Sequence, residues 1–172
     1  MATTLADRTE AADYYFMYID QVPPGQDIRR VIDAQLSEVL GVLGGISEEK
    51  SLYRYAPGKW SIRESVGHLN DTERLFVFRA MWFARGLGEP LPSFDQDVAL
   101  AGARFDERTL RDLVEEFKAV RAATQRFFAG IPDDVWAKRG IASGKAFTVR
   151  ALAHIVAGHT THHLKLLRER YL

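Results

Sequence analysis

The sequence predicts an all-α protein, a four-helix bundle with a long connection between its second and third helices. Four stretches of roughly 18 to 25 residues carry apolar side chains at spacings of three and four, which is the period of an amphipathic helix. Clusters of glycine and proline separate these stretches. Four helices that each bury one apolar face within a small domain are what a bundle requires.

Composition supports a single domain spanning residues 1–172. The chain is long enough for one substantial core and too short for two. Apolar residues make up 47% of it and charged residues 27%, which are ordinary values for a globular protein and argue against disorder. Basic and acidic residues number 23 each, so there is no net field to attract nucleic acid or an anionic membrane.

The absence of cysteine from the sequence excludes disulfide scaffolds, thiolate metal sites and cysteine nucleophiles. A transition-metal site must therefore use histidine, aspartate or glutamate. The first twenty residues contain early acidic residues and no basic-then-apolar run, so they do not resemble a secretory signal. No stretch approaches about 18 consecutive apolar residues, so we expect no membrane-spanning segment and a cytoplasmic location.

The chain begins with an aromatic-rich arm, residues 1–25, which we expect to pack onto the body of the bundle. The first long helix follows over residues 26–43 and stops at Gly44 and Gly45. A loop over residues 47–59 contains a proline-glycine pair, which interrupts regular structure.

Ser61 and Glu64 have the spacing of a capping box, so the second helix is expected to begin there and to run to about residue 84. The connection that follows is long and contains prolines, with room for a short helix over residues 94–101. Its length favours a crossover connection over a simple turn between neighbouring helices.

Asp106 or Thr109 is expected to cap the third helix, which ends at Gly130. Residues 138–147 hold two glycines and little periodicity, which predicts a loop and leaves room for an extended edge. Thr148 then caps the fourth helix, which runs to the end of the chain.

Four of the five histidines lie in this last helix. At about 100° per residue, His159 and His163 fall on its apolar stripe. His162 lies about 60° from His159, whereas His154 lies about 140° away and is expected on the outer face. Two inward imidazoles one turn apart either each have a hydrogen-bond partner in the core or share a metal ion, and the pattern alone leaves both interpretations open.

The fifth histidine, His68, lies at the edge of the apolar stripe of the second helix. A single inward histidine is more commonly a hydrogen-bonded core residue. Facing helices of a bundle also build metal sites, however, and three imidazoles would leave a position open for water or substrate. Asp71 projects to roughly the same face and, together with His162, is a candidate for proton transfer. Arg79, further along that face, either binds an anionic substrate group or forms a surface salt bridge.

The runs GKWSIRESVGHLND and HTTHHLKLLRERYL are unusual strings, and with them the chain resembles the DinB-like superfamily of bacterial four-helix bundles, particularly its YfiT-like metalloprotein branch. The resemblance covers nearly the whole chain from about Gln26. In that family a divalent metal is held by one histidine of the GHL segment and by two histidines four apart in the last helix. The resemblance therefore implies that His68, His159 and His163 are metal ligands, with zinc or nickel as the expected ion.

The same resemblance implies a range of activities. Characterised members include transferases and an isomerase that use low-molecular-weight thiols, and many others are described only as hydrolases. An ion with an open position lowers the pKa of a bound thiol or water and supplies a nucleophile at neutral pH. We therefore expect a metal-dependent enzyme of the transferase or hydrolase class that acts on a small molecule, in a homodimer. A metal-stabilised binding or stress-response protein without turnover and a plain structural bundle are the alternatives.

Overall fold

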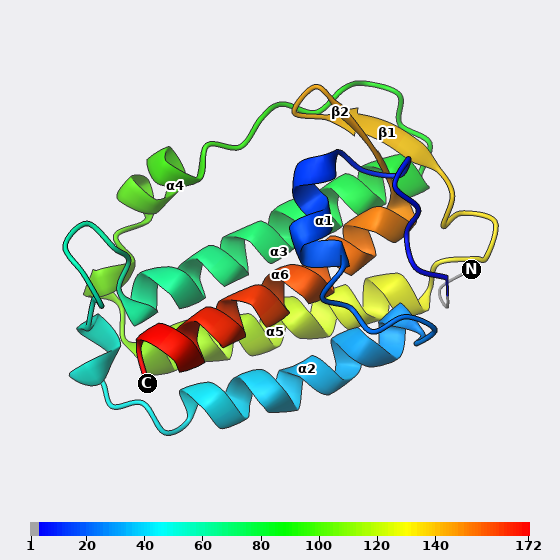
Figure 1. Ribbon diagram of the computed structural model, residues 1–172. Helices are drawn as coiled ribbons and strands as arrows, with labels where there is room; N and C mark the ends of the chain where they lie inside the picture. The colour runs from blue at the N-terminus through cyan, green and yellow to red at the C-terminus, as the bar shows by residue number, and fades with distance from the viewer. Residues whose placement is uncertain (1–3) are drawn as a thin grey trace.

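The computed structural model describes residues 4–172, which form a bundle of four long helices with short elements around it (Figure 1). The four long helices are α2 (Ile28–Leu43), α3 (Ile62–Ala84), α5 (Leu110–Ala129) and α6 (Val149–Arg170). The predicted fold class is confirmed. Residues 1–3 of the predicted arm lie outside the described residues. Within the described part, no helix combines the length and the apolar character that crossing a membrane requires.

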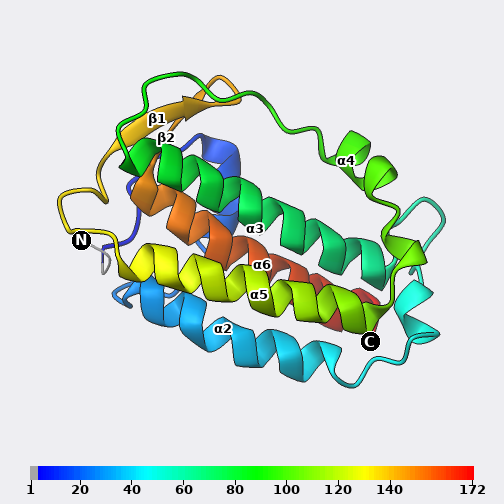
Figure 2. The ribbon, with the colours of Figure 1, turned by 180° about the vertical axis from the view of Figure 1, so that it is seen from behind.

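The helices are arranged so that α3 packs against both α5 and α6, and α2 packs against the same two helices from the other side. Figures 1 and 2 show that α3 and α5 run in one direction and that α2 and α6 run in the other. Since α3 and α5 are parallel neighbours, the chain must return along the length of the bundle between them. The crossover expected from the length of this connection is confirmed.

The crossover contains α4 (Gln96–Ala103) and a short 3-10 helix, η3 (Phe105–Glu107). None of the side chains of α4 is buried, and the helix lies on the outside of the bundle (Figure 1). It is shifted by two residues from the expected 94–101, because Asp95 caps it by accepting hydrogen bonds from its first amides.

Side-chain caps define the starts of the long helices. Ser61 and Glu64 form the predicted capping box: the Ser61 amide donates to Glu64 Oε2 at 2.8 Å and the Glu64 amide donates to Ser61 Oγ at 3.0 Å. Thr109, and not Asp106, caps α5 by accepting from the Asp112 amide at 3.1 Å. Asp106 instead accepts a hydrogen bond from Ser61 Oγ at 2.5 Å, which joins the end of the crossover to the start of α3.

The region expected to be a loop at 138–147 contains a two-stranded antiparallel hairpin, β1 (Arg139–Ala142) and β2 (Lys145–Thr148). Ser143 and Gly144 form its turn with φ angles of 53° and 67°. Positive φ at both positions is what a two-residue type I′ turn requires. The hairpin lies over the end of the bundle where α6 begins (Figure 1).

The arm contains a 3-10 helix, η1 (Asp13–Tyr15), and one turn of α-helix, α1 (Phe16–Ile19). As expected, it packs on the body of the protein, where α1 crosses α6. A β-carbon added at Gly158 of α6 would lie 2.0 Å from the Tyr18 carbonyl oxygen, so only glycine permits this approach of the two backbones.

The core consists of two apolar clusters, one toward the arm and hairpin and the other toward the C-terminal end of α6. Buried polar side chains lie between them, and we call these the polar layer. The polar layer consists of Gln35, His68, Asn70, Thr72, Glu73, Arg121, Thr124, His159, Thr160 and His163. In it, Arg121 donates to Glu73 at 2.8 Å, to Gln35 at 3.0 Å and to Thr160 at 2.9 Å, so that all four long helices are connected.

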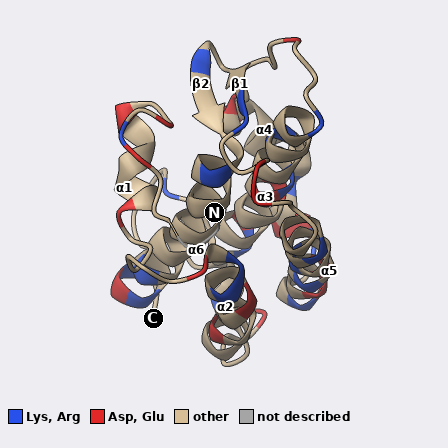
Figure 3. Cartoon of the chain, turned by 90° about the vertical axis from the view of Figure 1, so that its right-hand side faces the viewer, with Lys and Arg blue, Asp and Glu red and all other residues tan. Residues whose placement is uncertain are grey.

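Charged residues of both signs are interspersed over the bundle. In the end-on view of Figure 3, basic and acidic segments are mixed on α2 and on α5. No face of a single sign is seen in that view, which agrees with the equal numbers of basic and acidic residues.

Candidate metal centre

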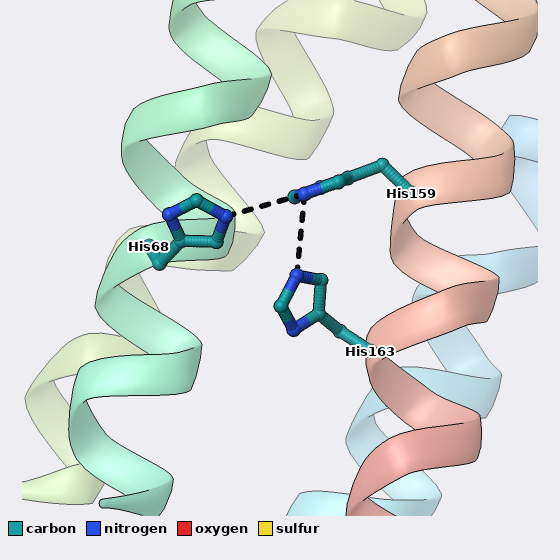
Figure 4. Close-up of side chains that lie close together, drawn as sticks. All are labelled: His68, His159 and His163. Carbon is teal, nitrogen blue, oxygen red and sulfur yellow. Dashed lines mark hydrogen bonds between the residues drawn. The ribbon is translucent and has the colours of Figure 1, made fainter. Parts of the chain in front are cut away.

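Three histidine side chains converge in the polar layer, one from α3 and two from α6 (Figure 4). His159 Nε2 lies 3.2 Å from His68 Nε2 and 3.2 Å from His163 Nε2. One ligand atom of each residue lies within 4.8 Å of those of the other two. Because residues four apart share one face of a helix, His159 and His163 both point toward α3, where His68 meets them.

Burial keeps the three imidazoles neutral. It lowers the pKa of His68 to about 4. Burial, together with the neighbouring imidazoles, also holds the pKa values of His159 and His163 well below the usual histidine value. At neutral pH each ring therefore carries one N–H and one nitrogen lone pair, which is the form that binds a metal ion.

Thr72 determines which nitrogen of His159 carries the hydrogen. Thr72 Oγ1 lies 2.6 Å from the His68 carbonyl oxygen, which can only accept, so the hydroxyl donates there. The same oxygen lies 3.4 Å from His159 Nδ1 and is left to accept from that nitrogen. The hydrogen of His159 is thus on Nδ1, and its Nε2 lone pair points at His68 and His163.

Hydrogen bonding within the cluster does not satisfy these nitrogens. His159 Nε2 has one lone pair and two imidazole nitrogens at 3.2 Å, so at most one of those contacts is a good hydrogen bond. His163 Nδ1 is buried without any hydrogen-bond partner. In a tetrahedral zinc site with Zn–N bonds of about 2.05 Å, neighbouring ligand nitrogens lie about 3.3 Å apart, so the observed spacing fits a shared ion.

Aromatic rings enclose the cluster. The Trp60 ring lies 4.8 Å from that of His68 and stacks parallel to that of His163 at 6.4 Å, between ring centroids. Tyr18 of the arm presents its ring edge-on to His159 at 5.0 Å. These contacts leave each histidine only 5–6% exposed.

Two cavities reach the cluster. A cavity of about 210 Å³ is lined by His68 and His159 together with side chains of the arm and α3. A second cavity of about 310 Å³ is lined by His163 and Trp60. Gln96, at the start of α4, lines both cavities, so the crossover lies over the cluster.

The family model of the DinB superfamily matches residues 32–167, which is most of the chain and includes all three histidines. The chain belongs to the DinB superfamily. Its structure is similar to that of YfiT from Bacillus subtilis, described as a probable metal-dependent hydrolase with an unusual four-helix bundle topology. The TM-score is 0.73 and the identity 13%, over 82% of this chain and 84% of YfiT, so the likeness shows a shared fold. No curated protein matches the sequence.

In this DinB-superfamily chain, the three histidines predicted as ligands are the three that the fold brings together. Asp71, predicted to assist proton transfer, is placed elsewhere. Its carboxylate lies 3.7 Å from Arg74, and the other charged groups that act on it are Glu116 of α5 and Arg108, which precedes α5. Burial raises the pKa of Asp71. Its assignment as a base stays a prediction.

His162 lies at the edge of the cluster without contributing a nitrogen to it. Its ring is edge-on to that of His163 at 5.3 Å and to that of Tyr18 at 5.4 Å, and it is half-buried. Burial lowers the pKa of His162 below the usual value, with Lys165 adding to the effect. Its predicted role in proton transfer also stays a prediction.

The expectation that His154 lies on the outer face is wrong. His154 is buried, and its Nδ1 lies 2.9 Å from the Arg150 carbonyl oxygen. The hairpin and the arm cover this end of α6, so residues 151–160 are buried on every side and the helix has no outer face there.

The sequence did not predict the places of three residues near the site, Thr72, Tyr18 and Arg79. Thr72 falls one turn after His68, a spacing that offers a signal for a supporting hydroxyl. Tyr18 was expected only to pack on the body, and the sequence holds no signal that pairs it with His159. Arg79 forms no surface salt bridge: it is buried, and it lines the cavity of His68 and His159.

Proposed function

We propose that this chain is a divalent-metal-dependent enzyme that activates water or a thiol at an ion held by His68, His159 and His163. The observation that carries the proposal is the convergence of three neutral imidazole nitrogens, two of them from residues that line one cavity and the third from a residue that lines another. Three protein ligands leave a position open, as catalytic sites do. The description of YfiT as a probable metal-dependent hydrolase supports the hydrolase arm of this proposal.

An all-imidazole ligand set without carboxylate or thiolate suits zinc and nickel, among other transition metals. Held by these three histidines, such an ion would lower the pKa of a water or thiol, so that it could supply a nucleophile at neutral pH. Thr72 keeps the His159 Nε2 lone pair available by accepting the hydrogen on Nδ1. Trp60 and Tyr18 exclude bulk water from two sides, which strengthens electrostatic interactions inside the site.

Proton transfer is assigned to His162 in this proposal. Its ring contacts that of His163, is accessible from solvent, and is neutral at pH 7 because its pKa is lowered. A neutral imidazole at that distance from a ligand is placed to accept the proton that an activated water or thiol releases.

A second candidate, a metal-stabilised protein without turnover, is favoured by one observation. The cluster joins α3 to α6 in the middle of the bundle, and each ligand is nearly inaccessible. An ion in that position would contribute directly to folding stability. In that case a chelator should lower the melting temperature strongly while the protein shows no turnover.

Turnover of model substrates by zinc- and nickel-loaded protein separates these candidates. We expect hydrolysis of p-nitrophenyl acetate, or conjugation of cysteine to 1-chloro-2,4-dinitrobenzene, to be lost both on chelation and in His163→Ala. His154→Ala is the matched control, since it removes a buried histidine of the same helix outside the cluster. Turnover that persists in chelated protein and in His163→Ala contradicts the proposed function, and metal-dependent stability without turnover supports the second candidate.

A further inference from the structure

Arg79 is a buried cation without a counter-charge. Its side chain is 2% exposed. Nη2 donates to the Pro92 carbonyl oxygen at 3.2 Å and to Ser143 Oγ at 3.0 Å, whereas Nε is buried with no acceptor. Within residues 4–172 no carboxylate lies close enough to Arg79 to form an ion pair. Burial lowers its pKa, and the phenol of Tyr15 opposes that effect.

The other fully buried arginine shows how this protein compensates such a charge when its role is structural. Arg121 donates to the Glu73 carboxylate through two nitrogens and to side chains of two further helices. A buried guanidinium without a counter-charge is costly, because its hydration is lost and the two hydrogen bonds of Nη2 replace only part of it. The contrast with Arg121 indicates that the acceptor missing at Arg79 comes from outside the chain.

The position of Arg79 shows where that acceptor would lie. Arg79 lines the same cavity of about 210 Å³ as His68 and His159, and it is the one lysine or arginine among the described residues that line it. Three tyrosines, Tyr14, Tyr15 and Tyr18, form part of the wall. The volume is about seven times the roughly 30 Å³ of a water molecule, so a compact ligand fits.

We propose that Arg79 is the anion-binding group of the site, and that the substrate is a compact molecule with one carboxylate, bound at Arg79, and an apolar body lying against the tyrosines. One guanidinium matches one carboxylate in charge and in planar geometry. When the carboxylate is bound at Arg79, the other end of the molecule, which reacts, faces the histidines. That last clause rests on the proposed function, whereas carboxylate binding at Arg79 does not.

Binding of benzoate and of its uncharged analogue benzamide to metal-free protein tests the proposal. Dissociation constants are measured by ligand-observed NMR titration. We expect benzoate to bind at least tenfold more tightly than benzamide, and Arg79→Gln to remove that difference. Arg74→Gln is the matched control: Arg74 is also on α3, but it pairs with Glu116 and lines a groove that contains no histidine, so the preference for benzoate should remain.

Arg79→Lys, which keeps the charge but not the planar fork, should weaken benzoate severalfold and decides the matter if Arg79→Gln does not fold. Equal binding of benzoate and benzamide to the wild type, or a preference unchanged in the folded Arg79 variants, would overturn the proposal. Zinc titration of the same proteins distinguishes failure of the proposed metal-dependent function from failure of the carboxylate subsite at Arg79. A preference for benzoate without zinc binding refutes the proposed function alone, and stoichiometric zinc without that preference refutes the subsite alone.

Discussion

At the scale of single residues, the state of the site depends on one hydroxyl. Thr72 donates to the His68 carbonyl oxygen and accepts from His159 Nδ1, so it links the backbone of one ligand to the ring of another. Groups that hold a ligand's second nitrogen in this way fix its tautomer and orientation. His163 has no such support, because its Nδ1 is buried without a hydrogen-bond partner within the described residues.

Replacing Thr72 by valine should lower zinc affinity by about 10- to 100-fold, because the acceptor for His159 Nδ1–H is lost while the shape is kept. Thr72→Ser keeps the hydroxyl and should remain within a few-fold of the wild type. Competition with a chromogenic chelator measures both constants. Zinc affinity of Thr72→Val equal to that of the wild type would show that the hydroxyl has no such role.

The two residues predicted to transfer protons are placed differently, and this leads to a ranking. His162 contacts the ring of a ligand, whereas Asp71 contacts Arg74 on the side of α5. We expect His162→Gln to reduce turnover at least tenfold more than Asp71→Asn does, with metal content unchanged in both. Rates at saturating substrate, normalised to bound metal, make the comparison, and a larger loss in Asp71→Asn would reverse the assignment.

At the scale of elements, the site is completed by a segment that is distant in sequence. The arm reaches α6 because Gly158 lets the Tyr18 backbone approach it, and this contact places the Tyr18 ring on His159. Glu10 fixes the other end of the arm. It accepts from Thr148 Oγ1 at 2.6 Å and from Arg150 Nε at 3.0 Å, both at the start of α6.

Gly158→Ala should destabilise the protein by about 2 kcal/mol or more, because the new methyl group overlaps backbone that cannot move without displacing α1. Gly41→Ala is the control. A β-carbon there meets no atom within 4 Å, so the exchange should be neutral or stabilising by up to about 1 kcal/mol. Urea unfolding measures both, and equal stabilities of the two variants would show that α1 does not dock as described.

The anchor of the arm should depend on pH. Burial raises the pKa of Glu10, but hydrogen bonds from Arg150 and Thr148 outweigh it and hold the pKa below the usual value of 4.5. The folded state thus binds the proton less readily than the unfolded state, so the stabilisation by Glu10 is complete above pH 4.5 and is lost as the pH falls through the lowered value.

The free energy of unfolding of the wild type should exceed that of Glu10→Gln by about 2 kcal/mol at neutral pH. That difference should shrink as the pH falls below 4.5. Urea titrations of both proteins between pH 7 and about pH 3 measure it. A difference independent of pH would show that the charge of Glu10 does not anchor the arm.

At the scale of the whole molecule, the features that depend on apolar periodicity and side-chain caps were predicted from the sequence, and the features that depend on contacts between distant segments were not. The four long helices and the capping box of α3 follow from local rules, because apolar spacing and side-chain caps act within a few residues. Periodicity also singled out His159 and His163, one turn apart on a buried stripe, and His68 at the edge of another, whereas their joint role as ligands was implied by the family resemblance. The Ser143-Gly144 pair is a sequence signal of the hairpin turn, but the two glycines and the weak periodicity of residues 138–147 favoured a loop.

What the sequence did not predict depends on long-range packing. His154 is buried because the arm and the hairpin dock over it. Arg79 lacks an acceptor for Nε because the fold places no carboxylate of the described residues beside it. The direction in which Asp71 points depends on helix α5 lying beside α3. The homodimer stays a prediction of the sequence.

Elemental analysis of protein loaded with zinc or nickel, and then freed of loosely bound metal, shows whether the three histidines bind one divalent ion. We predict one ion for each chain in the wild type and in His154→Ala, and almost none in His163→Ala. A wild-type chain that retains no ion, or His163→Ala that retains as much as the wild type, would contradict the account.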